Sequence, residues 1–193
     1  MAWGFFHEVG RKIIHITILI VLAAYFFIQD SVGKDLALLF LVGLLIVFLI
    51  LEYFRIELGW KMPFFSQFIR AKEENRMYGV IYFLSATIIS LAVFKKEIAL
   101  AALLMTTFGD MIAALVGKKY GTTLIYKNKT WAGFIAELVI NLIVGFIVLD
   151  NISIIFGMAI VATVVETLVD EMDDNLLIPI FAGFVGQIIL LSL

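Results

Sequence analysis

The residues with the clearest chemical potential are carboxylates placed inside or beside apolar segments. Asp110 follows Gly109 in the run Phe108–Gly121, which begins as an apolar segment and continues through lysines and glycines. A carboxylate at membrane depth costs roughly 2.5–3.5 kcal/mol on insertion scales, so an intramembrane Asp is a functional hypothesis by default. Magnesium prefers one or two carboxylates together with substrate phosphates. The sequence therefore predicts that Asp110 holds a divalent cation.

A second acidic group lies near the end of the chain. Glu166 and Asp170 are four residues apart and would share one face of a helix. Asp173 and Asp174 continue the group beyond that helix. An acidic cap facing water explains the aspartates but not Glu166, which lies inside an apolar run. Like charges this close repel unless a cation lies between them or one is protonated, and no basic residue follows Thr163. We expect a metal ion here, with Asp110, Glu166, Asp174 and Asp170 as its ligands.

Lysines and glycines lie between these two acidic groups. Glycine lets main-chain N–H groups approach an anion, and lysine supplies a point charge, so the stretch suits phosphate. The run Lys129-Thr130-x-x-Gly133 opens an expected helix, and a helix N-terminus binds anions readily. The spacing is not that of a Walker A loop. The alternative to phosphate binding is that these are ordinary lysines flanking a membrane segment. The four lysines are Lys118, Lys119, Lys127 and Lys129.

Two further pairs have helical spacing at the ends of apolar segments. Arg11 and His15 are four residues apart, and Glu52 and Arg55 are three apart. Each pair is either a structural anchor or part of a site. Arg76 could pair with phosphate or with a nearby glutamate.

The composition indicates an integral membrane protein. Of 193 residues, 63% are hydrophobic and 16% charged, with a mean hydropathy of +1.10. Soluble domains average about 45–50% apolar and about 25% charged residues. The chain has no cysteine, which excludes disulfides and thiolate chemistry, and its two histidines argue against a zinc enzyme. A net charge of −2 provides no general basic surface, so nucleic acid is not an expected partner.

Apolar runs of nearly 20 residues predict about seven transmembrane helices in an all-α fold. The expected spans are 13–28, 36–54, 78–94, 98–116, 131–149, 152–169 and 176–193, with a short polar link at 29–34. We expect one transmembrane catalytic domain over residues 1–193. Within it, residues 1–12 form an interfacial segment, 55–77 an amphipathic cytosolic link and 117–130 a nucleotide loop.

The distribution of basic residues predicts the orientation. With the N-terminus in the cytosol, 11 of the 14 basic residues lie in cytosolic segments and 3 in outer links. The same arrangement puts the N-terminal basic patch, the link 55–77, the lysine-glycine stretch and the late acidic group on one face. The site is therefore expected at the cytosolic membrane interface.

These pieces, in this order, resemble the polyprenol, phytol and CTP-dependent diacylglycerol kinases, relatives of the phosphatidate cytidylyltransferases. The matching motifs are Glu8-x-x-Arg11-Lys12-x-x-His15, Glu52-x-x-Arg55, Arg76-x-x-Gly79-x-x-Tyr82, Gly109-Asp110-x-x-Ala113-x-x-x-Gly117-x-x-x-Gly121, Lys129-Thr130-x-x-Gly133, and Glu166 eight residues before Asp174-Asn175, with Pro179 beyond. They cover nearly the whole chain. The Gly-Asp and Lys-Thr-x-x-Gly motifs belong to both branches of that group, whereas the Glu…Asp-Asn…Pro ending is similar to the kinase branch.

The resemblance implies transfer of the γ-phosphoryl group of CTP, with Mg²⁺, to the hydroxyl of a membrane lipid such as a polyprenol, dolichol, phytol or diacylglycerol. Asp110, Glu166 and Asp174 would be catalytic, holding metal or, for one of them, acting as base. The residues expected to bind nucleotide and phosphate are Lys118, Lys119, Lys129, Thr130, Gly133, Arg76 and Asn175, the last also orienting the cluster. The residues expected on the acceptor-lipid side are Arg11, His15, Glu52 and Arg55.

Two other functions compete with this interpretation. A CTP-dependent cytidylyltransferase acting on a lipid phosphate would release pyrophosphate instead of CDP. The absence of any arginine after Arg76 favours the kinase, because the cytidylyltransferases close with an acidic motif that contains one. A small transporter with an acidic pathway would place carboxylates on both faces or at the midplane. The glycine-bearing last three segments could pack within one chain or between two, so a homodimer is a further possibility.

Overall fold

The structure is a computed structural model that describes residues 19–59, 77–169 and 172–193. It contains two compact units, Met1–Ile88 and Ile89–Leu193. Four residues singled out in the sequence lie outside the described residues: Arg11, His15, Arg76 and Asp170. The interfacial segment 1–12 and most of the link 55–77 also lie outside them, and the single catalytic domain over 1–193 stays a prediction.

The first unit is helical where it is described. A helix over Leu19–Val32 is followed by α2 (Lys34–Glu57), and α3 (Gly79–Val93) begins in this unit. The predicted polar link 29–34 is wrong, because helix continues on both sides of a single residue, Gly33. That glycine has a φ of 104°, a left-handed conformation that costs a glycine little and breaks the helix there.

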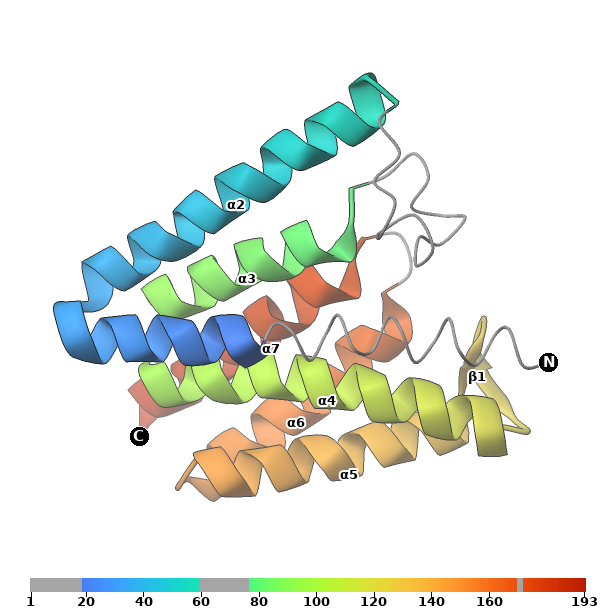
Figure 1. The fold of residues 1–193 in the computed structure, drawn as a ribbon. Coiled ribbons are helices and arrows are strands. Elements are labelled where there is room, and N and C mark those ends of the chain that lie inside the picture. Colours follow the sequence, from blue (N-terminus) through green and yellow to red (C-terminus); the bar gives the residue numbers. More distant parts are fainter. Residues whose placement is uncertain (1–18, 60–76, 170–171) are drawn as a thin grey trace. The chain divides into compact units, whose positions relative to one another are not determined.

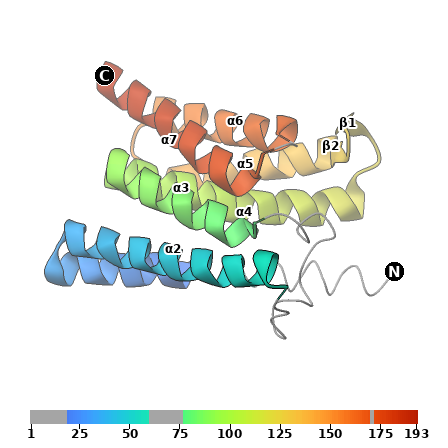
Figure 2. The ribbon, with the colours of Figure 1, turned by 90° about the horizontal axis from the view of Figure 1, so that it is seen from above.

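The second unit is a bundle of four helices with a small hairpin (Figures 1 and 2). Its elements are α4 (Lys96–Tyr120), β1 (Leu124–Tyr126), β2 (Lys129–Thr130), α5 (Trp131–Val148), α6 (Ile152–Leu168) and α7 (Asp174–Ser192). Helix α4 packs against α5 and α7, and α6 packs against α5 and α7. The four helices therefore share one core, into which their inward-facing residues project.

Small residues let these helices approach closely. Ala102, Ala159 and Ala182 are fully buried. A Cβ added at Gly186 of α7 would lie 2.5 Å from the sulfur of Met158 on α6, so a larger residue there would require Met158 to shift. Close contact through small side chains is the usual packing of helices in lipid, where water provides no driving force for their association. This packing fixes the relative positions of the side chains in the core.

The apolar helices agree with an integral membrane protein. Helices α2, α4, α5 and α7 are long and apolar enough to cross a membrane, and the helices Leu19–Val32, α3 and α6 are shorter but also apolar. The seven expected spans are thus confirmed as helices over the part of the chain that the structure describes. A total of seven membrane crossings and the orientation stay predictions.

The predicted loop 117–130 is corrected in two ways. Helix α4 continues to Tyr120, so Lys118 and Lys119 lie in its last turn, where basic side chains suit the negative end of the helix dipole. The rest contains an antiparallel pair of strands, with Leu124 opposite Thr130 and Tyr126 opposite Lys129. The all-α membrane fold fits the structure, and this short hairpin, which connects α4 to α5, is an addition to it.

Candidate active site

Three carboxylates from three helices meet in the second unit. Asp110 lies in α4, Glu166 is near the end of α6, and Asp174 is the first residue of α7. One carboxylate oxygen from each residue lies within 4.8 Å of those of the other two. We call these three residues the acidic cluster. The structure thus brings together three of the four residues predicted as metal ligands, and the fourth, Asp170, is outside the described residues.

The start of α7 fixes the position of Asp174. Asp173 is the N-cap, and its Oδ1 accepts hydrogen bonds from the backbone N–H of Asn175 at 3.1 Å and from the Asn175 side-chain amide at 2.8 Å. The Asn175 N–H also donates to Asp174 Oδ1 at 2.9 Å. N-cap bonds of this kind satisfy the free donors of a first helical turn. Asn175, expected to orient the cluster, is therefore a buried hydrogen-bond partner of the turn that carries Asp174.

Among the described residues, Lys129 is the basic residue that is paired with the acidic cluster. Its ammonium donates to Glu166 Oε1 and forms an ion pair with it. Burial alone would lower the pKa of Lys129, but the carboxylates of Glu166, Asp174 and Asp110 outweigh burial and raise that pKa above its ordinary value of 10.5. Lys129 is therefore a cation at neutral pH, and it partly compensates the charge of the cluster.

The second carboxylate oxygen of Glu166 is the strongest indication that the acidic cluster binds a ligand. Glu166 Oε2 is buried and has no hydrogen-bond partner among the described residues. A buried unpaired polar atom in a native structure requires an explanation, and an ion is one of them. Oxygen atoms around a magnesium ion lie up to about 4.2 Å apart across the ion, so a small contraction of the cluster would let all three carboxylates bind one cation. The cluster fits a divalent cation.

Thr130 joins the end of α4 to the start of α5. It is the N-cap of α5, and its hydroxyl oxygen accepts the Gly133 N–H at 3.2 Å. A Cβ at Gly117 would lie 3.0 Å from that hydroxyl, and one at Gly121 would lie 2.6 Å from it. The glycines of the Gly-Asp motif thus make room for Thr130. Because its hydroxyl already has a partner, Thr130 positions the first turn of α5.

A buried polar group that the sequence reasoning missed lies next to the acidic cluster. Glu137 and Asn141 are four residues apart on α5 and are 2% and 0% exposed. The Asn141 amide donates to Thr163 Oγ1 on α6 at 3.1 Å. A Cβ at Gly109 would lie 2.7 Å from Asn141 Oδ1. Glu137 and Asn141 therefore pack against Gly109, the residue before Asp110. The sequence could have indicated this pair, because two polar residues with helical spacing lie inside an apolar run.

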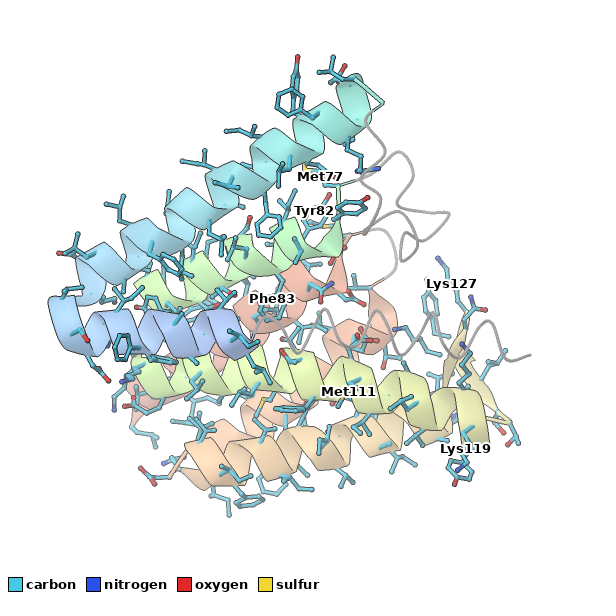
Figure 3. All side chains as sticks on the ribbon, viewed as in Figure 1. Met77, Tyr82, Phe83, Met111, Lys119 and Lys127 are labelled. Carbon is cyan, nitrogen blue, oxygen red and sulfur yellow. The ribbon has the colours of Figure 1, made fainter. Side chains whose placement is uncertain are left out.

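The remaining lysines of this region lie at the same end of the second unit but outside the core. Lys118, Lys119 and Lys127 are exposed, with Lys119 at the end of α4 and Lys127 in the hairpin turn (Figure 3). Lys127 has a positive φ of 46°, and its ammonium lies 5.4 Å from the centre of the Tyr126 ring. These side chains have the length to reach an anion bound outside the cluster.

Glu52 and Arg55, expected on the acceptor-lipid side, form a bidentate pair in the first unit. The Arg55 guanidinium donates to both Glu52 oxygens, at 2.8 and 2.7 Å. The backbone N–H of Tyr78 donates to Glu52 Oε1 at 2.9 Å, and the Arg55 guanidinium lies 4.2 Å from the centre of the Tyr78 ring. These contacts tie the end of α2 to the residue before α3. The predicted role toward lipid stays a prediction.

Comparison with known proteins identifies two groups of named lipid kinases. CTP-dependent diacylglycerol kinase 1 of Saccharomyces cerevisiae is 31% identical over 147 residues, which cover 71% of this chain and 49% of that protein. Phytol kinase 1, chloroplastic, of Arabidopsis thaliana is 29% identical over 129 residues, which cover 56% of this chain and 42% of that protein. The chain therefore spans less than half of the length of both named kinases.

A relative of similar length is also found. An uncharacterized protein of Rickettsia prowazekii is 29% identical over 187 residues, which cover 90% of each chain. No family model matches the chain, and no solved structure matches it.

Proposed function

Since the chain belongs to the lipid-kinase family of the CTP-dependent diacylglycerol kinases and phytol kinases, we propose that it transfers the γ-phosphoryl group of CTP to the hydroxyl of a membrane lipid. The acceptor class is a lipid alcohol, of which diacylglycerol, phytol and polyprenols are examples. The observation that carries the proposal is the acidic cluster. Its three carboxylates lie close together, and Lys129 forms an ion pair with one of them, Glu166.

The arrangement suits phosphoryl transfer, which requires mainly positioning and neutralisation of charge. A divalent cation, when bound, neutralises charge on the nucleotide phosphates. Asp110, Glu166 and Asp174 would hold that cation. The first turn of α5 offers N–H groups, and Lys129 offers an ammonium, to the phosphates. The exposed Lys118 and Lys119 extend this positive surface at the end of α4.

The reaction proceeds by attack of the lipid oxygen on the γ-phosphorus. A bond forms between the lipid oxygen and phosphorus, the bond from the γ-phosphorus to the β,γ-bridging oxygen breaks, and CDP leaves with that oxygen. The proton of the lipid hydroxyl passes to a carboxylate of the acidic cluster, which acts as general base. A lipid alcohol stays in the bilayer with its hydroxyl at the interface, so the site belongs at the membrane surface. The distribution of basic residues supports a position of this surface on the cytosolic side.

A labelled-nucleotide assay tests the proposal. The full chain, purified in detergent with Mg²⁺, is given γ-labelled or α-labelled CTP and a panel of diacylglycerol, phytol and polyprenol. We expect the γ-label to appear in lipid, with CDP as the second product. Pyrophosphate and α-labelled lipid would instead identify a cytidylyltransferase, and no labelled lipid with any alcohol would overturn the proposal.

A matched pair of variants tests the site in the same assay. Asp110→Asn removes a charge from the acidic cluster and is expected to abolish transfer. Asp150→Asn is the control, because Asp150 is exposed in the turn between α5 and α6, at the other end of these helices. Normal turnover by the Asp110→Asn variant would show that the site is assigned wrongly.

A further inference from the structure

We propose that Lys129 occupies the position of the divalent cation while the site is empty, and that the arriving cation displaces it from Glu166 toward the nucleotide phosphates. This inference rests on the proposed function, because it assigns Lys129 two successive partners in the same reaction. It also explains how Lys129 can bind phosphate and Glu166 can bind metal, although neither can do so while the two side chains are paired. Lys129 was expected to bind phosphate and Glu166 to bind metal, yet the two side chains bind each other.

The charges of the site favour such an exchange. Three carboxylates face one ammonium, since Asp110 and Asp174 act electrostatically on Lys129 together with Glu166. Glu166 shares its ammonium partner with two further carboxylates, and its Oε2 stays unpartnered within the described residues. A divalent cation would bring two positive charges and could use that free oxygen. The pair of Lys129 and Glu166 therefore leaves one buried oxygen unsatisfied within the described residues, and a divalent cation can replace the ammonium.

The burial of the two partners decides which one moves. The Lys129 side chain is 38% exposed, whereas that of Glu166 is 3% exposed. Glu166 is a buried residue of α6. Lysine has a flexible four-carbon stem with an ammonium that is strongly hydrated, so Lys129 can leave at little cost. When the pair separates, Lys129 turns outward and Glu166 keeps its place.

The backbone beneath Lys129 is anchored, so only its side chain needs to move. The neighbouring Thr130 is held by its hydrogen bond to Gly133 and by close contact with Gly117 and Gly121. Lys129 itself is paired with Tyr126 across the hairpin. These contacts keep the Lys129 Cα at the entrance of the first turn of α5, where the N–H groups for a phosphate lie. The ammonium released from Glu166 thus has an anion site within reach.

The exchange predicts an order of events and a coupling between ligands. The cation must displace Lys129 before that lysine can bind phosphate, so the cation makes the site competent for nucleotide. A nucleotide that binds the released ammonium in turn favours the displaced state and tightens cation binding, because such coupling is reciprocal. Lys129 would then prevent the nucleotide from being held firmly in the absence of the cation.

Equilibrium binding of Mn²⁺, followed by electron paramagnetic resonance, tests the exchange without any turnover. The full chain in detergent micelles is titrated as the wild type and as Lys129→Gln, Lys129→Arg and Lys127→Gln. Loss of the competing charge should tighten Mn²⁺ binding by Lys129→Gln about tenfold or more. Lys129→Arg keeps the charge and Lys127→Gln changes an exposed lysine of the hairpin, so both should stay close to the wild type. CTP should tighten Mn²⁺ binding by the wild type more than by Lys129→Gln.

The outcomes separate this inference from the proposed function. Unchanged or weaker Mn²⁺ binding by Lys129→Gln would overturn the exchange, as would equal tightening by Lys129→Arg, since that would reveal an effect of size and not of charge. Asp110→Asn serves as the test of the cation site itself. If it bound Mn²⁺ as the wild type does, the cation site and the function built on it would fail, whatever Lys129 does.

Discussion

Two buried glutamates, one in each unit, have opposite surroundings. Glu52 is 3% exposed and accepts three hydrogen bonds, two from Arg55 and one from the backbone of Tyr78, so both of its oxygens are used. Glu166 is 2% exposed, but within the described part of the chain only one of its oxygens has a partner. Two further carboxylates, which are also negatively charged, lie beside Glu166. The partners of Glu52 are instead hydrogen-bond donors.

The contrast separates a structural ion pair from a site. A buried charge whose lone pairs are all occupied has nothing left to offer a ligand, and it holds its own helix ends together. A buried charge with a free oxygen and neighbours of the same sign is unfavourable until something positive arrives. Burial and the presence of a basic partner are common to both glutamates, so neither property alone identifies function.

The largest expected effect comes from removing the charge of Glu166. Glu166→Gln should reduce the rate of lipid phosphorylation on the order of a thousandfold, because a direct ligand of the cation is lost. Thermal stability should stay the same or rise, since one of three crowded charges is gone. Product formation and the melting temperature measure the two effects in one preparation. If the Glu166→Gln variant were strongly destabilised but phosphorylated lipid at the normal rate, Glu166 would be a structural residue like Glu52.

The opposite pattern is expected for the Glu52 pair. Arg55→Met leaves the Glu52 carboxylate buried with one donor and should lower the free energy of unfolding by about 3 kcal/mol. The double variant Glu52→Leu/Arg55→Met removes the stranded charge and should recover much of that loss. Unfolding in detergent measures both. If Arg55→Met left stability unchanged and raised the KM for lipid, the pair would belong to the acceptor site after all.

A smaller effect is expected from a methyl group beside the acidic cluster. Gly109→Ala would put a Cβ 2.7 Å from Asn141 Oδ1 and push α5 away from α4 next to Asp110. Misplacement of Asp110 should lower the rate about tenfold. Gly43→Ala in α2 is the control, because a Cβ there meets nothing within 4 Å. It should stabilise the helix by less than about 1 kcal/mol. Equal rates for the two variants would show that the buried pair Glu137 and Asn141 does not position Asp110.

The smallest effect concerns pH. The pKa of Lys129 is raised above 10.5, so its ammonium stays charged at pH 7 and at pH 9, and its contribution to stability is lost only as pH rises through the folded-state value. The pair contributes about 1 kcal/mol or less, because the ammonium is partly solvated. The difference in melting temperature between the wild type and Lys129→Gln should therefore be the same at pH 7 and pH 9. A difference that disappears between these two pH values would contradict a raised pKa.

The helices and the acidic cluster followed from the sequence for clear reasons. Apolar runs such as 131–149 and 152–169 identify helices to within a residue of α5 and α6, because backbone in lipid must satisfy its own hydrogen bonds. Asp110 and Glu166 were recognised because a charge in an apolar run is conspicuous. Their meeting followed from the expectation that a cation compensates them.

Other features depend on contacts that the sequence does not display. The hairpin of Leu124–Tyr126 with Lys129–Thr130 is too short to show a strand pattern. The pair Lys129 and Glu166 joins residues 37 positions apart. Glu137 was overlooked because it has no charged neighbour nearby in the sequence. Only the structure shows that it packs against Gly109 of α4.

A crystal or cryo-EM structure with Mn²⁺ and a non-hydrolysable CTP analogue tests the central claim most directly. The account predicts one Mn²⁺ bound by oxygen atoms of Asp110, Glu166 and Asp174, with the Lys129 ammonium turned from Glu166 to a phosphate. A Mn²⁺ ion bound elsewhere, with Lys129 still paired to Glu166 beside the bound nucleotide, would contradict it.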